Sequence, residues 1–84
     1  MNFDVILKKP AKKFIKKLDK ESQIRIINKL KSLKCNPSLG VPLGGRLAGL
    51  WKLRIGKYRV VYEIVKSKLV VYVLKVGHRK NVYG

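Results

Sequence analysis

A strand-like run over residues 51–62 places two arginines and a lysine where they could stabilise a negatively charged group. Gly56 and Lys57 interrupt this run, and glycine at the first central position suits a two-residue type II′ turn. In such a hairpin, Arg54 lies directly opposite Arg59. Because strand side chains alternate between faces, Lys52 projects on the same face as both arginines. Like charges directly across a ladder are destabilising, so the pattern predicts that an anion binds there.

The composition indicates what that anion could be. The chain has 84 residues and carries 21 lysines and arginines against four acidic residues, a formal charge of +17. So high a charge on a small domain predicts a polyanionic partner, with nucleic acid as the leading candidate. An anionic membrane surface and an acidic protein are the alternatives. The hydrophobic content of 46% predicts a folded core rather than a disordered basic tail.

Metal and disulfide chemistry find little support in the sequence. Cys35 is the only cysteine and His78 the only histidine, so we expect no internal disulfide, no Cys/His zinc site and no cofactor. The apolar run at residues 5–7 is too short for a signal peptide or a membrane span. We therefore expect a cytoplasmic protein without a membrane partner.

The first half of the chain predicts a strand followed by a helical hairpin. Residues 3–7 read as a short strand, and Pro10 suits the first turn of the helix that follows. The apolar stripe of this helix comprises Ala11, Phe14, Ile15 and Leu18. Asp19 can cap a second helix, and almost nothing separates the two helices, so we expect a tight antiparallel pair.

The second half predicts three strands, over residues 50–55, 58–65 and 69–76. The last is apolar at nearly every position and should be central in the sheet. The expected fold class is α+β, in the order β-α-α-β-β-β, as a single domain over residues 1–84. The helical hairpin would pack on one face of an antiparallel sheet, and the cations would lie on the other. The last strand should bring residues 77–79 to the same end of the sheet as these cations.

The hairpin and the ending of the chain together resemble the RelE/ParE toxin superfamily of prokaryotic toxin–antitoxin systems. The similarity covers nearly the whole chain, including the lysine-rich helices, residues 47–54, residues 56–62 and the Val76-Gly77-His78-Arg79 ending. Within that superfamily, the chain is similar to the archaeal-type RelE proteins. The resemblance implies a toxin of a type II system that cleaves messenger RNA in the ribosomal A site without a metal. It also implies a RelB-like acidic antitoxin as partner.

The resemblance assigns catalytic roles to four residues. In this family the ribose 2′-OH of the RNA attacks the adjacent phosphate, so the protein supplies a base, an acid and cations. Arg59 matches the phosphate-stabilising arginine, and Arg79 matches an arginine that acts on the leaving group or the transition-state charge. Lys52 matches a catalytic lysine, the expected base if neighbouring arginines favour its neutral form. Tyr83 is near the position of a tyrosine that stacks on a base or engages the 2′-OH.

Further residues allow more than one interpretation. The residues expected to bind RNA or phosphate are Arg46, Arg54 and His78. Arg54 could instead pair with Glu63 or a chain end, and a lone histidine is more often a structural group. Leu50 stands two residues before Lys52, where the best-studied RelE pattern has another lysine. ParE relatives share the scaffold but target DNA gyrase, so a toxin without nuclease activity is the alternative function.

Overall fold

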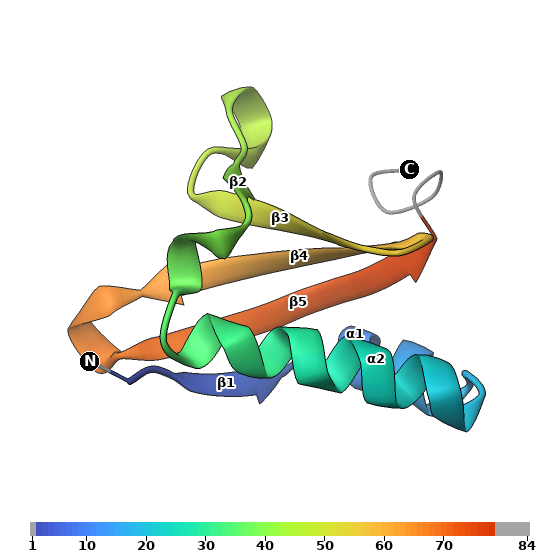
Figure 1. Cartoon of the computed structure of the whole chain (residues 1–84). Helices are drawn as coiled ribbons and strands as arrows, with labels where there is room; N and C mark the ends of the chain where they lie inside the picture. The colour runs from blue at the N-terminus through green and yellow to red at the C-terminus, as the bar shows by residue number, and fades with distance from the viewer. Residues whose placement is uncertain (1, 79–84) are drawn as a thin grey trace.

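A five-stranded sheet organises the computed structural model, which describes residues 2–78 of the chain. The sheet consists of β1 (Asp4–Leu7), β2 (Val41–Pro42), β3 (Leu50–Ile55), β4 (Tyr58–Val65) and β5 (Val70–His78). Figure 1 shows these strands in the spatial order β1-β5-β4-β3-β2, with α2 lying across one face. The two helices are α1 (Lys9–Lys16) and α2 (Lys20–Lys31).

The predicted order of elements is confirmed, with one short strand added. The strands expected over residues 50–55 and 58–65 have those bounds, and β5 lies between β1 and β4, as a central strand should. β5 begins at Val70 because Leu69 has a left-handed backbone, with φ of 54°. β2 was not predicted, since its two residues lie in a loop rich in proline and glycine that carries no strand signal of its own.

The sheet is mixed, which corrects the expectation of an antiparallel sheet. β1 pairs with β5 in parallel, while the other three strand pairs are antiparallel. The cause is the length of α2, which carries the chain back to the end of the sheet where β1 begins. There the Phe3 N–H donates to the Lys34 carbonyl at 2.8 Å. β3 therefore starts from that end, and two hairpin reversals later β5 runs in the direction of β1.

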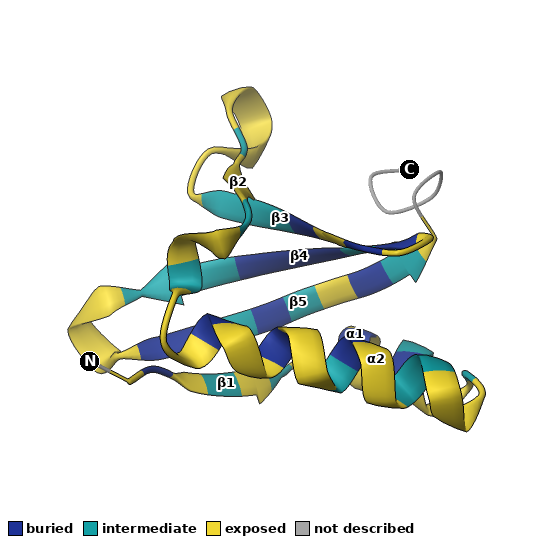
Figure 2. Cartoon of the chain, viewed as in Figure 1, coloured by how far each residue is buried: buried dark blue, intermediate teal, exposed yellow. Residues whose placement is uncertain are grey.

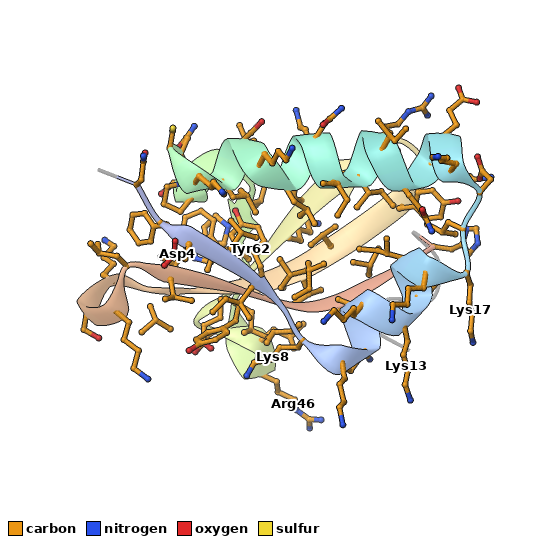
Figure 3. The ribbon with its side chains drawn as sticks, turned by 90° about the horizontal axis from the view of Figure 1, so that it is seen from below. Asp4, Lys8, Lys13, Lys17, Arg46 and Tyr62 are labelled. Carbon is orange, nitrogen blue, oxygen red and sulfur yellow. The ribbon has the colours of Figure 1, made fainter. Side chains whose placement is uncertain are left out.

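Local chemistry places the helix boundaries where the sequence predicts them. Pro10 lies in the first turn of α1, and Asp19 is the N-cap of α2. The Ser22 hydroxyl and backbone N–H donate to the Asp19 carboxylate at 2.7 and 3.2 Å. The hydroxyl bond, followed by the backbone bond, lowers the pKa of Asp19 from its ordinary value. Only residues 17–19 separate the helices, and Figure 3 shows the chain reversing between them.

The core lies between the helices and the sheet. Figure 2 shows the buried residues of α2 turned towards the sheet and its outer face exposed. The largest fully buried side chains are Tyr62, Ile26, Leu33, Val60, Val71 and Val73. Trp51 is partly buried and stacks on Tyr62 with ring centroids 6.2 Å apart, so Trp51 packs against the core that contains Tyr62. No helix within residues 2–78 is long and apolar enough to cross a membrane.

Candidate functional site

The β3–β4 hairpin brings three of the predicted site residues together. Arg54 lies directly opposite Arg59, and Lys52 is on the same strand face two residues before Arg54. The hairpin register follows from its turn, because Gly56 has φ of 57° while Lys57 does not have a positive φ. That combination is the one a type II′ turn requires. The predicted register is confirmed, and it holds two guanidinium-bearing residues side by side.

A hollow of about 400 Å³ lies beside these cations, between α2 and the edge of the sheet at β2 and β3. We call it the cationic hollow. Its lining residues are Lys29, Leu39, Gly40, Val41, Lys52, Leu53, Arg54 and Arg59. Four of these eight residues are cations and none is acidic, so the hollow favours an anionic ligand.

A close backbone approach forms the rim of the cationic hollow. A Cβ atom on Gly40 would lie 2.2 Å from the backbone oxygen of Lys52, so only glycine allows the segment before β2 to approach β3 this closely. The Tyr62 hydroxyl donates to the Pro37 carbonyl at 2.7 Å and accepts from the Gly40 N–H at 3.0 Å. Burial raises the pKa of Tyr62 above its ordinary value of 10.0. A core tyrosine therefore fixes the loop that lines the hollow.

The free edge of β3 adds a backbone donor to the hollow. In a two-residue hairpin the closing pair, here Ile55 and Tyr58, exchanges hydrogen bonds, so the peptide groups of Arg54 point away from β4. β2 pairs with β3 only at Trp51 and Lys52. The Arg54 N–H is therefore left at the edge that β2 does not cover. A phosphate oxygen beside Arg54 could accept from this N–H as well as from the guanidinium.

The alternative acidic partner of Arg54 lies elsewhere on the sheet. Glu63 is opposite Leu50, whereas Arg54 is opposite Arg59, four residues further along β3. At roughly 3.3 Å per residue, that separation is too long for a direct ion pair across the hairpin. The register therefore argues against Glu63 as the direct partner of Arg54, and a contact of Arg54 with RNA stays a prediction.

Arg46 lies away from the cationic hollow. It is exposed on a single 3₁₀ turn, Gly45–Leu47, between β2 and β3. Figure 3 shows its side chain pointing away from α2, to the same side of the molecule as Lys13. The structure therefore does not bring Arg46 together with Arg54 and Arg59, and its contact with RNA stays a prediction.

His78 shares an end of the sheet with Arg59 but not a face. It is opposite Tyr58, whereas Gly77 is opposite Arg59. Its ring packs against Phe14 of α1 and against Tyr58, with centroids 6.1 and 5.2 Å apart. This aromatic cluster lies on the side of the helices and supports the structural interpretation of the lone histidine. An RNA contact by His78 stays a prediction.

The remaining predicted catalytic residues, Arg79 and Tyr83, lie outside the described residues. β5 ends at His78, and Gly77 pairs with Arg59. The last described residues therefore reach the end of the sheet that carries the arginine pair, as the topology predicts.

Sequence analysis missed Lys29 and Leu39, which line the cationic hollow from α2 and from the loop before β2. Lys29 is one of many exposed lysines on the helices, and its spacing does not distinguish it from the others. Leu39 follows Pro37 in a 3₁₀ turn that has no hydrophobic period. Only the packing of this turn beside α2 shows that the two residues share a surface with Arg54.

Known structures share this fold. The toxin–antitoxin complex RelBE2 from Mycobacterium tuberculosis contains a chain that is 28% identical, with a TM-score of 0.87 and coverage of 96% of this chain and 95% of that chain. The archaeal RelE–RelB complex from Pyrococcus horikoshii gives 25% identity and a TM-score of 0.78, covering 98% and 100%. The fold and the basic hairpin thus define a small toxin of the RelE/ParE class.

Sequence comparison gives the family. A RelE-like toxin protein of Escherichia coli is 33% identical over 86 residues, covering 96% of this chain and 87% of that protein. The family model for the ParE toxin of type II toxin–antitoxin systems matches residues 5–83. The chain therefore belongs to this toxin family, and the resemblance found from the sequence alone is confirmed.

Proposed function

We propose that this toxin is an endoribonuclease that cleaves messenger RNA in the ribosomal A site. The observation that carries the proposal is the Arg54–Arg59 pair, which lies beside Lys52 on a hollow with four cations and no acid in its lining. A bound anion would lower the repulsion between two cations held opposite each other in a hairpin. A phosphodiester in its transition state, with charge building on the nonbridging oxygens, is such an anion. The names of the RelE-like relatives support this reading.

The proposed reaction needs no nucleophile from the protein. Lys52 removes the proton from a ribose 2′-OH, and the oxygen attacks the adjacent phosphorus. The bond from phosphorus to the 5′-oxygen breaks, which leaves a 2′,3′-cyclic phosphate on one fragment and a 5′-OH on the other. Arg59 and Arg54 stabilise the charge on the nonbridging oxygens.

Two roles in the proposal rest on the family resemblance. Arg79 stabilises the leaving 5′-oxygen, which takes up a proton as the bond breaks. Tyr83 stacks on a base or engages the 2′-OH. The reaction is metal-independent in this proposal, since the charge is balanced by the arginines.

The ribosome is the proposed partner that orients the RNA. The chain has four acidic residues and one histidine, so its site can stabilise charge but offers little acid–base chemistry. Such a site gains most from a partner that holds the 2′-oxygen in line with the leaving oxygen. We therefore expect naked RNA to be a poor substrate.

A translation reaction with a defined message tests the proposal. Ribosome-bound message should be cut within codons and yield 5′-OH ends, while a message with a single 2′-deoxy substitution at the cleavage position should stay intact there. The same RNA without ribosomes serves as the control. Equal cleavage of naked and ribosome-bound message, or cleavage of the 2′-deoxy position, contradicts the proposal.

A toxin that inhibits DNA gyrase without cutting RNA is the second candidate. The observation in its favour is the match of residues 5–83 to the ParE family model. A supercoiling assay with purified gyrase distinguishes the two. Intact messages together with blocked supercoiling would establish the ParE-like function and exclude the nuclease.

An acidic antitoxin of the RelB kind is the proposed regulator, acting in the cytoplasm. The RelBE2 and archaeal RelE–RelB structures are toxin–antitoxin complexes. A chain with a formal charge of +17 would also attract an acidic, partly disordered protein that folds on binding. Co-expression with the neighbouring open reading frame should give a stable complex. A toxin that stays monomeric and harmless in that experiment contradicts the assignment.

A further inference from the structure

We infer that the cationic hollow holds a nucleotide next to the scissile phosphate, with Lys29 of α2 binding its phosphate and Leu39 contacting its base or ribose. The inference rests on the proposed function only in taking RNA as the ligand. Lys29 and Leu39 lie outside the proposed catalytic set, and they extend it into a second subsite.

The size of the hollow suits one nucleotide. Its volume of about 400 Å³ lies within the range of roughly 300–1,000 Å³ that small-molecule sites occupy. The Arg54–Arg59 pair and Lys52 line it from the β3–β4 hairpin, and Lys29 lines it from α2. A single phosphate bound at the arginine pair would leave the remainder of the hollow unfilled, so the site is larger than the reacting group requires.

The hollow combines cations with exposed apolar side chains. Leu39 is 37% exposed and Val41 is 55% exposed, and both lie in its lining. Scattered exposed apolar residues need no explanation, but these two flank a hollow that also contains four cations. A nucleotide matches both features, because its phosphate pairs with lysine while its base and ribose bury apolar surface. An inorganic anion would use only the cations.

The strand edge sets the path of the RNA from one subsite to the next. β2 covers β3 no further than Lys52, so the N–H of Arg54 stays at the open edge of β3, beside a hollow that Lys29 also lines. An RNA backbone that passes Arg59 can therefore continue along this edge, where the Arg54 N–H donates to a phosphate oxygen. Lys29 then neutralises the neighbouring phosphate from the helix side.

The subsite is preorganised. The Tyr62 hydroxyl bonds to Pro37 and Gly40 hold the loop that carries Leu39, and Gly40 packs directly on the backbone oxygen of Lys52. Because this rim is fixed by the core, a bound nucleotide does not have to order it, which favours affinity.

The test uses binding of a labelled RNA hexanucleotide that carries 2′-O-methyl groups throughout, so that it cannot be cleaved. Fluorescence anisotropy compares the wild-type protein with Lys29→Ala and Leu39→Ala. The matched controls are Lys31→Ala, which removes the same charge from the same helix outside the hollow, and Ile24→Ala, which removes an apolar side chain that is 53% exposed. Circular dichroism verifies that each variant is folded.

Lys29→Ala should weaken binding about tenfold, the effect of one charge-assisted contact. It should also reduce the slope of log affinity against log salt by about 0.7, the value for one phosphate contact with single-stranded nucleic acid. Leu39→Ala should weaken binding without changing the slope. Both controls should stay within about twofold of wild type, because neither Lys31 nor Ile24 lines the hollow and a distant exposed charge is largely screened by salt.

Equal losses for Lys29→Ala and Lys31→Ala would overturn the inference, because they would show that only the overall charge attracts RNA. Absence of measurable hexanucleotide binding by the wild-type protein would overturn it as well.

The subsite and the proposed nuclease function can fail independently of each other. If ribosome-bound messages stay intact while Lys29 and Leu39 still determine hexanucleotide affinity, the subsite stands and the nuclease proposal falls. If messages are cut but Lys29 behaves like Lys31, the nuclease stands and the subsite falls.

Discussion

α2 separates two depressions of the surface that differ in what they can bind. The cationic hollow lies between α2 and β3, and a second depression of about 190 Å³ lies between α2 and β1. We call the second one the apolar groove, lined by Val5, Leu7, Ile27, Leu30, Lys31 and Lys34. Both depressions include lysines from α2 or the turn that follows it. The lysines of the helix therefore do not explain why one depression is cationic and the other apolar. The difference comes from the strand that faces the helix in each.

The strands differ because of how each one is paired. β3 is joined to β4 by a tight hairpin, so its register puts Arg54 and Arg59 opposite each other at an open edge. β1 pairs in parallel with β5, and its Val5 and Leu7 lie opposite the buried Val71 and Val73. The residues of β1 that line the apolar groove thus share a face with core valines, whereas those of the β3–β4 hairpin include the cations that line the hollow.

The largest effect should come from Lys52 in the cationic hollow. Lys52→Ala should lower message cleavage on ribosomes by about 10²–10⁴, the contribution of a general base. Lys52→Arg keeps the charge but cannot readily lose a proton, so it should be equally impaired. Measured cleavage rates distinguish the two roles. Wild-type rates for Lys52→Arg would show that Lys52 acts only through its charge.

Arg59→Ala should lower the cleavage rate by about 10²–10³, because the side chain stabilises charge that develops in the transition state. Arg79→Ala should behave in the same way. Single-turnover rates on ribosomes, together with growth arrest in cells, measure the effect. Lys66→Ala, on the turn between β4 and β5 at the far end of the sheet, is the control. An Arg59→Ala variant that remains fully toxic would remove the cationic hollow from the mechanism.

Tyr62→Phe should test how the rim of the hollow is held. The substitution removes the hydroxyl bonds to Pro37 and Gly40 and should lower the free energy of unfolding by about 1–2 kcal/mol. Urea denaturation measures the loss. The residues that line the apolar groove make no hydrogen bond to this hydroxyl, so amide exchange should accelerate in residues 38–41 and not in β1.

Ionisation of the same tyrosine should destabilise the folded protein at alkaline pH. Burial raises the pKa of Tyr62, so its stabilising contribution is complete below the ordinary pKa of 10.0 and is lost as pH rises through the higher folded pKa. Wild-type protein should therefore lose more stability than Tyr62→Phe between neutral and strongly alkaline pH. Identical pH profiles for the two proteins would contradict this assignment.

The smallest effect should come from the lysines of the apolar groove. Lys31→Ala and Lys34→Ala remove as much charge as substitutions in the cationic hollow, yet message cleavage should change by less than about twofold, since exposed charges at a distance are screened. Message-cleavage rates of the two variants and of the wild-type protein, measured at physiological salt, test this expectation. Losses comparable to that of Arg59→Ala would end the distinction between the two depressions.

Local sequence alone determined the features that depend on neighbouring residues. A glycine at the first position of a two-residue turn sets the register of Arg54 and Arg59, and the Asp19–Ser22 hydrogen bonds set the start of α2. These features were predictable because the atoms involved lie within a few residues of one another. The strand bounds 50–55 and 58–65 followed for the same reason.

Tertiary structure alone decided the features that join distant segments. The parallel pairing of β1 with β5 depends on where α2 returns the chain, and the face on which His78 lies depends on its packing with Phe14. Lys29 and Leu39 come together with Arg54 only because the Tyr62 hydroxyl and Gly40 hold the intervening loop against β3. No local period encodes these contacts, since they arise from the shape of the packed core and not from the spacing of residues along the chain.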